Sequence, residues 1–233
     1  MSSKLPWVQV IAWALACALG EPAFAEPAVL DWEAAFPVES AARDVYVDAH
    51  FLGSDGNPHR LQIWRHGSEF LHRRTDEALD LYLSQAGVKG DYAYRLIDHH
   101  RRVSMAVTRN QLYRIGVFSD WFGLAHVLDR PKSEFELRAV APLPKERAAG
   151  CSWRLMVHGG KGAAERSRIC WSTQWGLPLA IRTLGAKGEW IERFSVDRVG
   201  GISPSVDGLT LPRLPDDYVS FNAGSEIDPK VGD

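Results

Sequence analysis

Short segments with apolar residues at alternate positions recur along most of this chain of 233 residues. In residues 45–51, for example, every second residue is apolar, beginning with Val45 and ending with Phe51. A period of two is typical of β-strands that bury one face. Turn-forming residues, such as those at 54–58, separate the segments. We therefore predict about nine to eleven antiparallel strands joined by hairpins.

The middle of the chain has a different period. Between residues 109 and 128, apolar residues recur at helical spacing, at Leu112, Ile115, Phe118, Phe122, Ala125 and Leu128. Ser119 and Asp120 can cap a helix that runs to Asp129. The spacing predicts a short helical hairpin or a kinked helix between two sets of strands.

One short helix is also expected at the start of the domain. Residues 29–36 favour a short helix that Pro37 ends, and the chain is loop-like after Pro212. The predicted fold class is α+β and mainly antiparallel β. One curved sheet wrapped around two or three short helices fits this order of elements better than βαβ units do.

The first 25 residues have the three parts of a secretory signal. Lys4 supplies the basic region, residues 7–19 form an apolar run, and a small-x-small triplet ends at Ala25. The apolar run is too short to span a bilayer. We expect export to the bacterial periplasm with cleavage after Ala25, and lipoprotein processing at Cys17 is the alternative. We expect no transmembrane segment in the mature chain.

The mature chain is expected to form one domain over residues 26–225, followed by a flexible tail over residues 226–233. The formal net charge of −2 gives no general attraction to nucleic acid or to anionic lipid. We therefore expect no nucleic-acid partner.

Cys151 and Cys170 are the two cysteines of the mature chain. Residues 152–157 alternate like a strand, residues 158–163 form a turn, and residues 168–173 form the returning strand. Folding this hairpin places the two cysteines almost opposite each other, and pairing is the default in an oxidising compartment. The disulfide should stabilise the fold by roughly 3 kcal/mol. A redox-active pair is the alternative, although there is no Cys-x-x-Cys sequence.

The second half of the chain contains a longer motif. Residues 169–181 read Ile-Cys-Trp-Ser-Thr-Gln-Trp-Gly-Leu-Pro-Leu-Ala-Ile, and residues 188–194 read Gly-Glu-Trp-Ile-Glu-Arg-Phe. This run of strand, turn, Gly-Leu-Pro-Leu, strand, glycine turn and strand resembles the lipoprotein-carrier superfamily of LolA, LolB and RseB. The motif covers residues 171–194, and the order of elements is compatible over the whole mature chain.

The resemblance implies a half-open β-barrel whose helices cover an apolar cavity. It also implies a non-enzymatic binding or regulatory protein that holds an acyl chain, a lipoprotein segment or another apolar ligand. Broad aromatic walls suit such ligands because they offer area with few hydrogen-bonding groups. The candidate cavity and lid residues are Trp64, Tyr82, Tyr94, Met105, Phe118, Trp121, Phe122, Leu128 and Trp171. For each of them, ordinary packing in the core is the alternative.

Other functional classes find less support in the sequence. His99 and His100 are adjacent and point to opposite faces of a strand, whereas His50, His66 and His72 lie on different strands and could converge on a metal. There is no Gly-x-Ser-x-Gly, no His-Glu-x-x-His and no haem-attachment sequence. We expect no cofactor and no catalysis. An interaction module with a filled core, acting on an envelope protein, and a metal or cofactor accessory protein remain alternatives.

Overall fold

The computed structural model describes residues 29–85, 92–108, 120–144, 146, 150–159, 165–202 and 210–222. Its strands are β1 (Val29–Leu30), β2 (Asp44–Leu52), β3 (Pro58–His66), β4 (Phe70–Thr75), β5 (Leu79–Gln85), β6 (Tyr92–Asp98), β7 (Val103–Thr108), β8 (Phe135–Ala139), β9 (Ser152–His158), β10 (Arg166–Ser172), β11 (Leu177–Leu184), β12 (Trp190–Gly201) and β13 (Val219–Asn222). The described helices are α1 (Trp32–Ala35) and α3 (Trp121–His126). Within these residues, no helix has the length and apolar character needed to cross a membrane.

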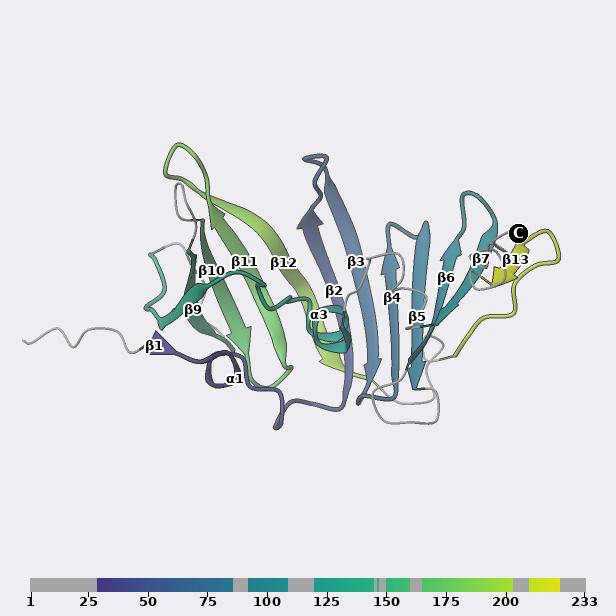
Figure 1. Ribbon diagram of the computed structural model, residues 1–233, viewed down its shortest axis with the longest axis horizontal. Helices are drawn as coiled ribbons and strands as arrows, with labels where there is room; N and C mark the ends of the chain where they lie inside the picture. The colour runs from purple at the N-terminus through teal and green to yellow at the C-terminus, as the bar shows by residue number, and fades with distance from the viewer. Residues whose placement is uncertain are drawn as a thin grey trace, which may run out of the picture.

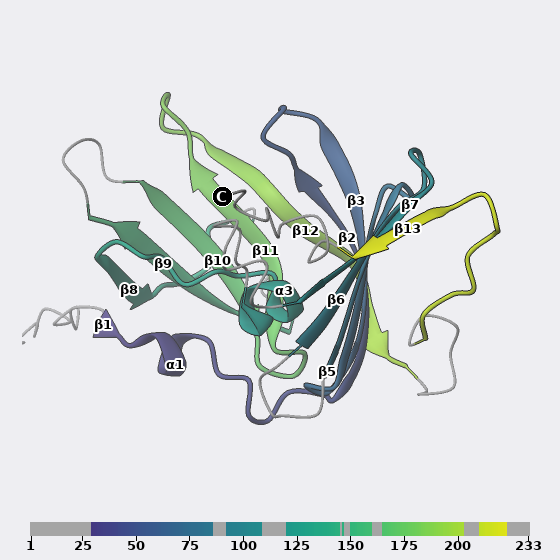
Figure 2. The ribbon, with the colours of Figure 1, turned by 45° about the vertical axis from the view of Figure 1, so that its right-hand side comes forward.

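All thirteen strands belong to one open sheet, in the order β1-β8-β9-β10-β11-β12-β2-β3-β4-β5-β6-β7-β13. Strands β2 to β7 and strands β8 to β12 each run as successive hairpins, and the pairing of β12 with β2 joins the two groups. The strand pairs are antiparallel except for β7 with β13, which is parallel. The sheet curves, and α1 and α3 lie in its hollow (Figures 1 and 2). The predicted class, a mainly antiparallel and half-open sheet with short helices, is confirmed.

Two edge strands raise the number of strands above the predicted range. Strand β1 lies within residues 29–36, where the sequence predicts a helix. The helix begins only after Asp31, because this residue is extended and its carboxylate accepts a hydrogen bond from the Ala34 backbone N–H at 2.7 Å. Strand β13 forms after Pro212, where the sequence predicts a loop, because the distant strand β7 supplies its pairing partner. Local periodicity carries no signal of such long-range pairing.

Helix α3 begins where the sequence predicts and ends earlier. Asp120 is its N-cap, and the side chain accepts a hydrogen bond from the Gly123 backbone N–H at 2.8 Å. The helix stops at His126 rather than at Asp129, because Val127 adopts a left-handed conformation with φ of 56°. Phe118 and the rest of residues 109–119 lie outside the described residues.

Buried apolar side chains form two clusters. The first joins strands of both hairpin groups to α3, through Val45, Val47, Ala49, Leu61, Ile63, Leu71, Leu83, Tyr94, Val107, Ala125, Leu177 and Phe194. The second joins α1 to β8, β9 and β10, through Trp32, Ala35, Phe36, Leu128, Leu137, Met156, Ile169 and Trp171. These clusters fill much of the hollow and position the helices over the sheet.

Cys151 and Cys170 form the predicted disulfide, with their Cα atoms 5.4 Å apart. The pairing geometry differs from the prediction in one respect. The residue opposite Cys170 on the neighbouring strand is Trp153, and Cys151 lies two positions before it, outside β9. Because residues two apart share a face, the thiol of Cys151 still reaches Cys170.

Candidate functional site

The alternation of side chains along β3 defines the two faces of the sheet. Arg65 contacts α3, so Leu61, Ile63 and Arg65 point into the hollow, which we call the concave face. Gln62 and Trp64 point to the opposite, convex face. Residues that are paired across neighbouring strands share a face, so the register extends this assignment to β2, β4 and the strands beyond them.

Arg65 connects α3 to two other segments of the chain. One guanidinium nitrogen donates to the carbonyl oxygen of Ala125 at the end of the helix, at 3.2 Å. The other donates to the carbonyl oxygens of Trp175, at 2.7 Å, and Ala42, at 3.2 Å. No ion pair joins Arg65 to a carboxylate among the described residues, and burial lowers its pKa to about 10. Arg65 is therefore a buried cation that is held by backbone carbonyls.

Two further polar contacts lie at the C-terminal end of α3. Arg73 on β4 donates to the carbonyl oxygen of Leu124 at 3.1 Å, and burial lowers its pKa. The imidazole Nδ1 of His126 lies against the carbonyl oxygen of Gly176. Burial, followed by the charge of Arg65, lowers the pKa of His126 to about 4, so this imidazole is neutral at physiological pH. Two arginines thus satisfy carbonyls that a helix end leaves without partners.

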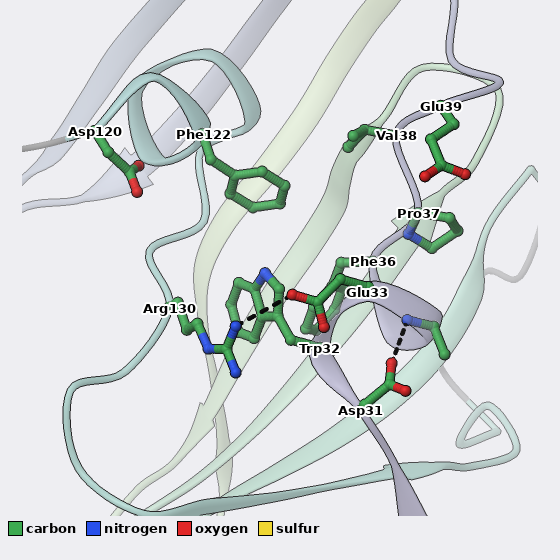
Figure 3. Close-up of a pocket in the computed structure, with 11 residues that line it drawn as sticks. Asp31, Trp32, Glu33, Phe36, Pro37, Val38, Glu39, Asp120, Phe122 and Arg130 are labelled. Carbon is green, nitrogen blue, oxygen red and sulfur yellow. Dashed lines mark hydrogen bonds and ion pairs between the residues drawn. The ribbon is translucent and has the colours of Figure 1, made fainter. Parts of the chain in front are cut away.

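Two adjoining cavities flank α3, and Phe122 and Val38 line both of them. The larger cavity has a volume of about 600 Å³ and lies between the α1 segment and the N-terminal end of α3 (Figure 3). Its lining residues are Asp31, Trp32, Glu33, Ala34, Phe36, Pro37, Val38, Glu39, Asp120, Phe122 and Arg130. The smaller cavity has a volume of about 380 Å³ and is lined by Val38, Ala41, Ala42, Arg43, Arg65, Gly67, Ser68, Trp121, Phe122 and His126. We call the two cavities together the groove.

Aromatic rings form the floor of the larger cavity. Trp32 packs edge-on against Phe36, with ring centroids 4.7 Å apart, and lies 5.9 Å from Phe122. Phe122 in turn stacks on Trp171, with centroids 6.3 Å apart. Both Trp32 and Phe36 are buried, so the floor is fixed by the second cluster. Phe122 is the part of the aromatic lining that α3 contributes.

Six of the predicted cavity and lid residues, including Phe122, lie on the concave side, and their binding role stays a prediction. Trp121 lines the smaller cavity and stacks on Tyr92, with ring centroids 4.8 Å apart. Leu128 and Trp171 are buried in the second cluster beneath the groove. Tyr94 and Met105 belong to the first cluster and are not among the residues that line either cavity.

The predicted positions of Trp64 and Tyr82 are wrong, because the strand register places both rings on the convex face. They pair across His72 in a row that continues to Tyr46. The His72 ring stacks between them, with centroids 4.6 Å from Trp64 and 4.1 Å from Tyr82. These rings therefore pack against one another and do not line a space beneath α3.

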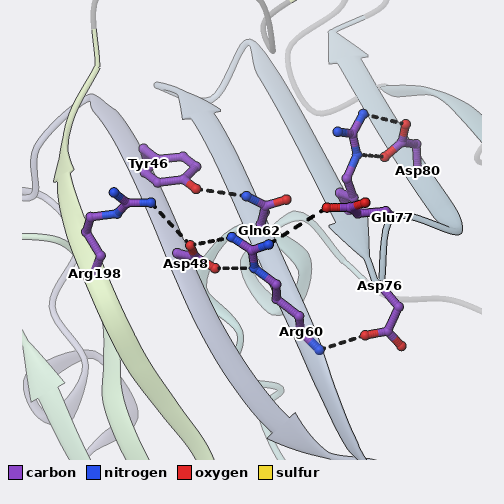
Figure 4. Close-up of polar contacts among 9 residues, drawn as sticks. Tyr46, Asp48, Arg60, Gln62, Asp76, Glu77, Asp80 and Arg198 are labelled. Atoms are coloured by element: carbon purple, nitrogen blue, oxygen red, sulfur yellow. Dashed lines mark hydrogen bonds and ion pairs between the residues drawn. The ribbon is translucent and has the colours of Figure 1, made fainter.

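The rest of the convex face carries ion pairs (Figure 4). Arg60 makes two hydrogen bonds of 2.8 Å to the carboxylate of Asp48, and Arg198 reaches the same carboxylate at 3.3 Å. The hydrogen bond from Arg60, the largest cause, lowers the pKa of Asp48. These charges are therefore mutually paired on the convex face.

Several residues of the groove were not predicted from the sequence. Trp32, Phe36 and Val38 lie in or next to a segment for which the sequence predicts only a short helix. The position of Arg65, by contrast, could have been recognised from the sequence. It follows Leu61 and Ile63 at the period of a strand, so a charged residue occupies an inward position. A charge at an inward position indicates a buried polar contact.

His50, His66 and His72 do not converge, because each contacts a different carboxylate. His66 bonds to Asp44, His72 to Asp80 at 3.0 Å, and His50 lies 2.5 Å from Asp197. Among the residues that the structure describes, no group of three or more metal-binding side chains occurs.

No protein-family model matches this sequence, and no curated protein gives a significant match. Solved structures do match. MucB is 17% identical over 74% of this chain and 58% of its own, with a TM-score of 0.38. The structure of the MucA/MucB complex of Pseudomonas aeruginosa contains a chain that is 17% identical over 72% of this chain and 56% of its own, with a TM-score of 0.39.

An uncharacterized conserved protein from Thermus thermophilus is 13% identical over 79% of this chain and 91% of its own, with a TM-score of 0.36. This chain therefore spans a little over half the length of the MucB chains it matches. These TM-scores are low, so the function of this chain rests on its own residues.

Proposed function

We propose that this protein is a non-enzymatic periplasmic binding protein that holds an apolar ligand, such as an acyl chain or a lipoprotein segment, in the groove. The observation that carries this proposal is the larger cavity, whose aromatic floor lies on the concave face next to a short helix. Its volume is within the usual range of ligand pockets, about 300–1,000 Å³.

The energetics favour an apolar ligand. Each methylene removed from water contributes about 0.8 kcal/mol, so about six methylenes over Trp32 and Phe122 would contribute ~5 kcal/mol before the costs of ordering the chain. The buried rings of the floor are already packed, and this preorganisation limits the ordering cost on the protein side.

Helix α3 is suited to act as a cover. It has six residues, which is too short for independent stability, so its position depends on contacts with the sheet. Its polar anchors lie at the C-terminal end, at Arg65 and Arg73, whereas Phe122 lies near the other end. Loss of the contacts made by these arginines would free α3 and widen the groove. The disulfide fits an oxidising compartment, which supports export through the signal segment proposed for residues 1–25.

The test is ligand binding by delipidated mature protein, followed with a fluorescent fatty acid and a fluorescent lipopeptide. We expect saturable binding, and Phe122→Ala should weaken it about tenfold because the shared wall of both cavities is lost. Phe70→Ala is the matched control, because Phe70 is also half-buried but lies on the convex face, in the register position opposite Ser84. Absence of binding to both probes would contradict the proposal.

A second function has one observation in its favour. The first cluster is closely filled beneath α3, where Val47, Leu71 and Leu83 have no exposed surface. The protein could then act on an envelope partner through an outer surface, with the groove unused. An envelope protein that binds equally well to wild type and to Phe122→Ala, in the absence of ligand binding, would favour this alternative.

A further inference from the structure

Charged side chains surround the larger cavity, and most of them are acidic. Asp31, Glu33, Glu39 and Asp120 line it, and Arg130 is the cation among its lining residues. Arg130 already binds the carboxylate of Glu33, at 3.2 Å. The cavity therefore combines an aromatic floor with more carboxylates than cations. An uncharged acyl chain would contact the floor but would form no ion pairs with the carboxylates.

The carboxylates are distributed around the floor rather than gathered at one point (Figure 3). Asp31 and Glu33 belong to the α1 segment, Glu39 follows Val38, and Asp120 caps α3. Asp31 and Asp120 are engaged as helix caps, while Glu33 and Glu39 are exposed. An occupant of the cavity therefore meets negative charge from the stretch of residues 31–39 and from Asp120.

A cation can also approach the aromatic floor. The guanidinium of Arg130 lies 5.9 Å from the centre of the Trp32 ring, which is within the range of a cation–π contact. This contact shows that the rim of the cavity accommodates a positive charge over an aromatic ring.

We propose that the occupant of the larger cavity is a protein segment in which lysine or arginine side chains flank apolar ones. This proposal rests on the proposed function, because it names the ligand class of the same groove. The apolar side chains would contact Trp32, Phe36 and Phe122, and the cations would face the rim carboxylates. A protein segment is favoured over a lipid with one cationic group, because four carboxylates spread around the cavity match several cations on one occupant.

The experiment compares three short peptides of the same leucine and phenylalanine pattern, with lysine, glutamine or glutamate at the remaining positions. Their affinities for the disulfide-bonded mature protein are measured by calorimetry at low and high salt. We expect the lysine peptide to bind about tenfold more tightly than the glutamate peptide, and the difference to shrink as salt screens the rim.

Variants of the rim make the test specific. Glu33→Gln with Glu39→Gln should weaken binding of the lysine peptide about fivefold, because exposed ion pairs are individually weak. Glu77→Gln with Glu165→Gln is the matched control, with the same change of charge at exposed positions away from the cavity. Arg130→Gln should instead strengthen binding of the lysine peptide about twofold, because it removes the cation that pairs with Glu33. General damage to the fold would weaken binding and would not strengthen it.

The outcomes separate this proposal from the proposed function. Equal affinity for the three peptides, or equal effects of the rim and control variants, would overturn it, while fatty-acid binding would leave the proposed function standing. Binding of dodecyltrimethylammonium with the same dependence on Glu33 and Glu39, but no binding of the lysine peptide, would overturn the choice of a protein segment. If neither the peptides nor the fatty acid bind, both proposals fail.

Discussion

Arg65 is the residue on which the position of α3 most depends. A buried cation without a carboxylate is costly, and here three backbone carbonyls from separate segments offset that cost. Backbone carbonyls cannot change their charge, so this contact differs from an ion pair. It holds the helix, the segment before β2 and the turn between β10 and β11 in one arrangement.

Replacing Arg65 with methionine should therefore loosen α3 in particular. We expect Arg65→Met to lower the free energy of unfolding by about 2 kcal/mol, because buried carbonyls lose their donors. Hydrogen exchange of the amides of α3 should accelerate more than that of the central strands. Arg193→Met, at an exposed position, is the control. Unchanged exchange in α3 would show that Arg65 does not hold the helix.

Asp80 on the convex face predicts how the stability of the fold depends on pH. Its carboxylate lies 3.0 Å from His72, 2.8 Å from Arg74 and 2.9 Å from His99. Burial by itself raises the pKa of Asp80, but the hydrogen bonds from these three residues outweigh burial and hold the pKa below its usual range. A carboxyl group of this kind stabilises the fold above its unfolded pKa, about 4, and this stability is lost as the pH falls further.

We expect Asp80→Asn to lower the free energy of unfolding at neutral pH by about 3 kcal/mol, because it breaks a buried charge cluster. Below a pH of about 4 the difference from wild type should shrink, since the Asp80 carboxyl group of the unfolded wild type then binds a proton that the folded state does not bind. Urea unfolding at several pH values measures both effects, with the exposed Asp216→Asn as the control. A difference that is constant with pH would contradict this account.

At the scale of elements, the second hairpin group is fixed by contacts on two faces. Ile169 and Trp171 of β10 belong to the second cluster, whereas Arg168 and Cys170 point to the other face. Arg168 bonds to Glu146 at 2.6 and 2.8 Å, and Cys170 forms the disulfide with Cys151. The segment before β9 is thus fastened to the sheet by a covalent bond and an ion pair.

Removal of the disulfide should cost about 3 kcal/mol, since the loop that it closes spans a sequence separation of 19 residues. Replacement of both Cys151 and Cys170 with serine should lower the urea midpoint, and wild type under reducing conditions should unfold like this variant. A wild-type midpoint that does not respond to reductant would show that the bond contributes nothing to stability.

The strands could be predicted from the sequence because their apolar residues alternate locally, as in β2 and β3. The N-cap of α3 could also be predicted, because Asp120 precedes an apolar helical pattern. Strand β13 could not, since its pairing with β7 joins distant parts of the chain. The convex position of Trp64 and Tyr82 could not be predicted, because an aromatic residue on a strand gives no sign of which face the hollow occupies.

At the scale of the whole molecule, the pairing of β12 with β2 converts two hairpin groups into one curved sheet. The hollow of that sheet receives α1 and α3 (Figure 2). The larger cavity lies between the α1 segment and α3. No single segment contains this site. Its lining comes from the α1 segment, the residues before β2, α3 and Arg130, so it forms only when the folded chain brings α1 and α3 together.

The most direct test of this account is to locate a bound ligand by nuclear magnetic resonance. A lipopeptide or fatty acid, added to labelled mature protein, should give intermolecular contacts to Trp32, Phe36 and Phe122. Contacts to Trp64 and Tyr82 on the convex face, with none to the groove, would contradict the central claim.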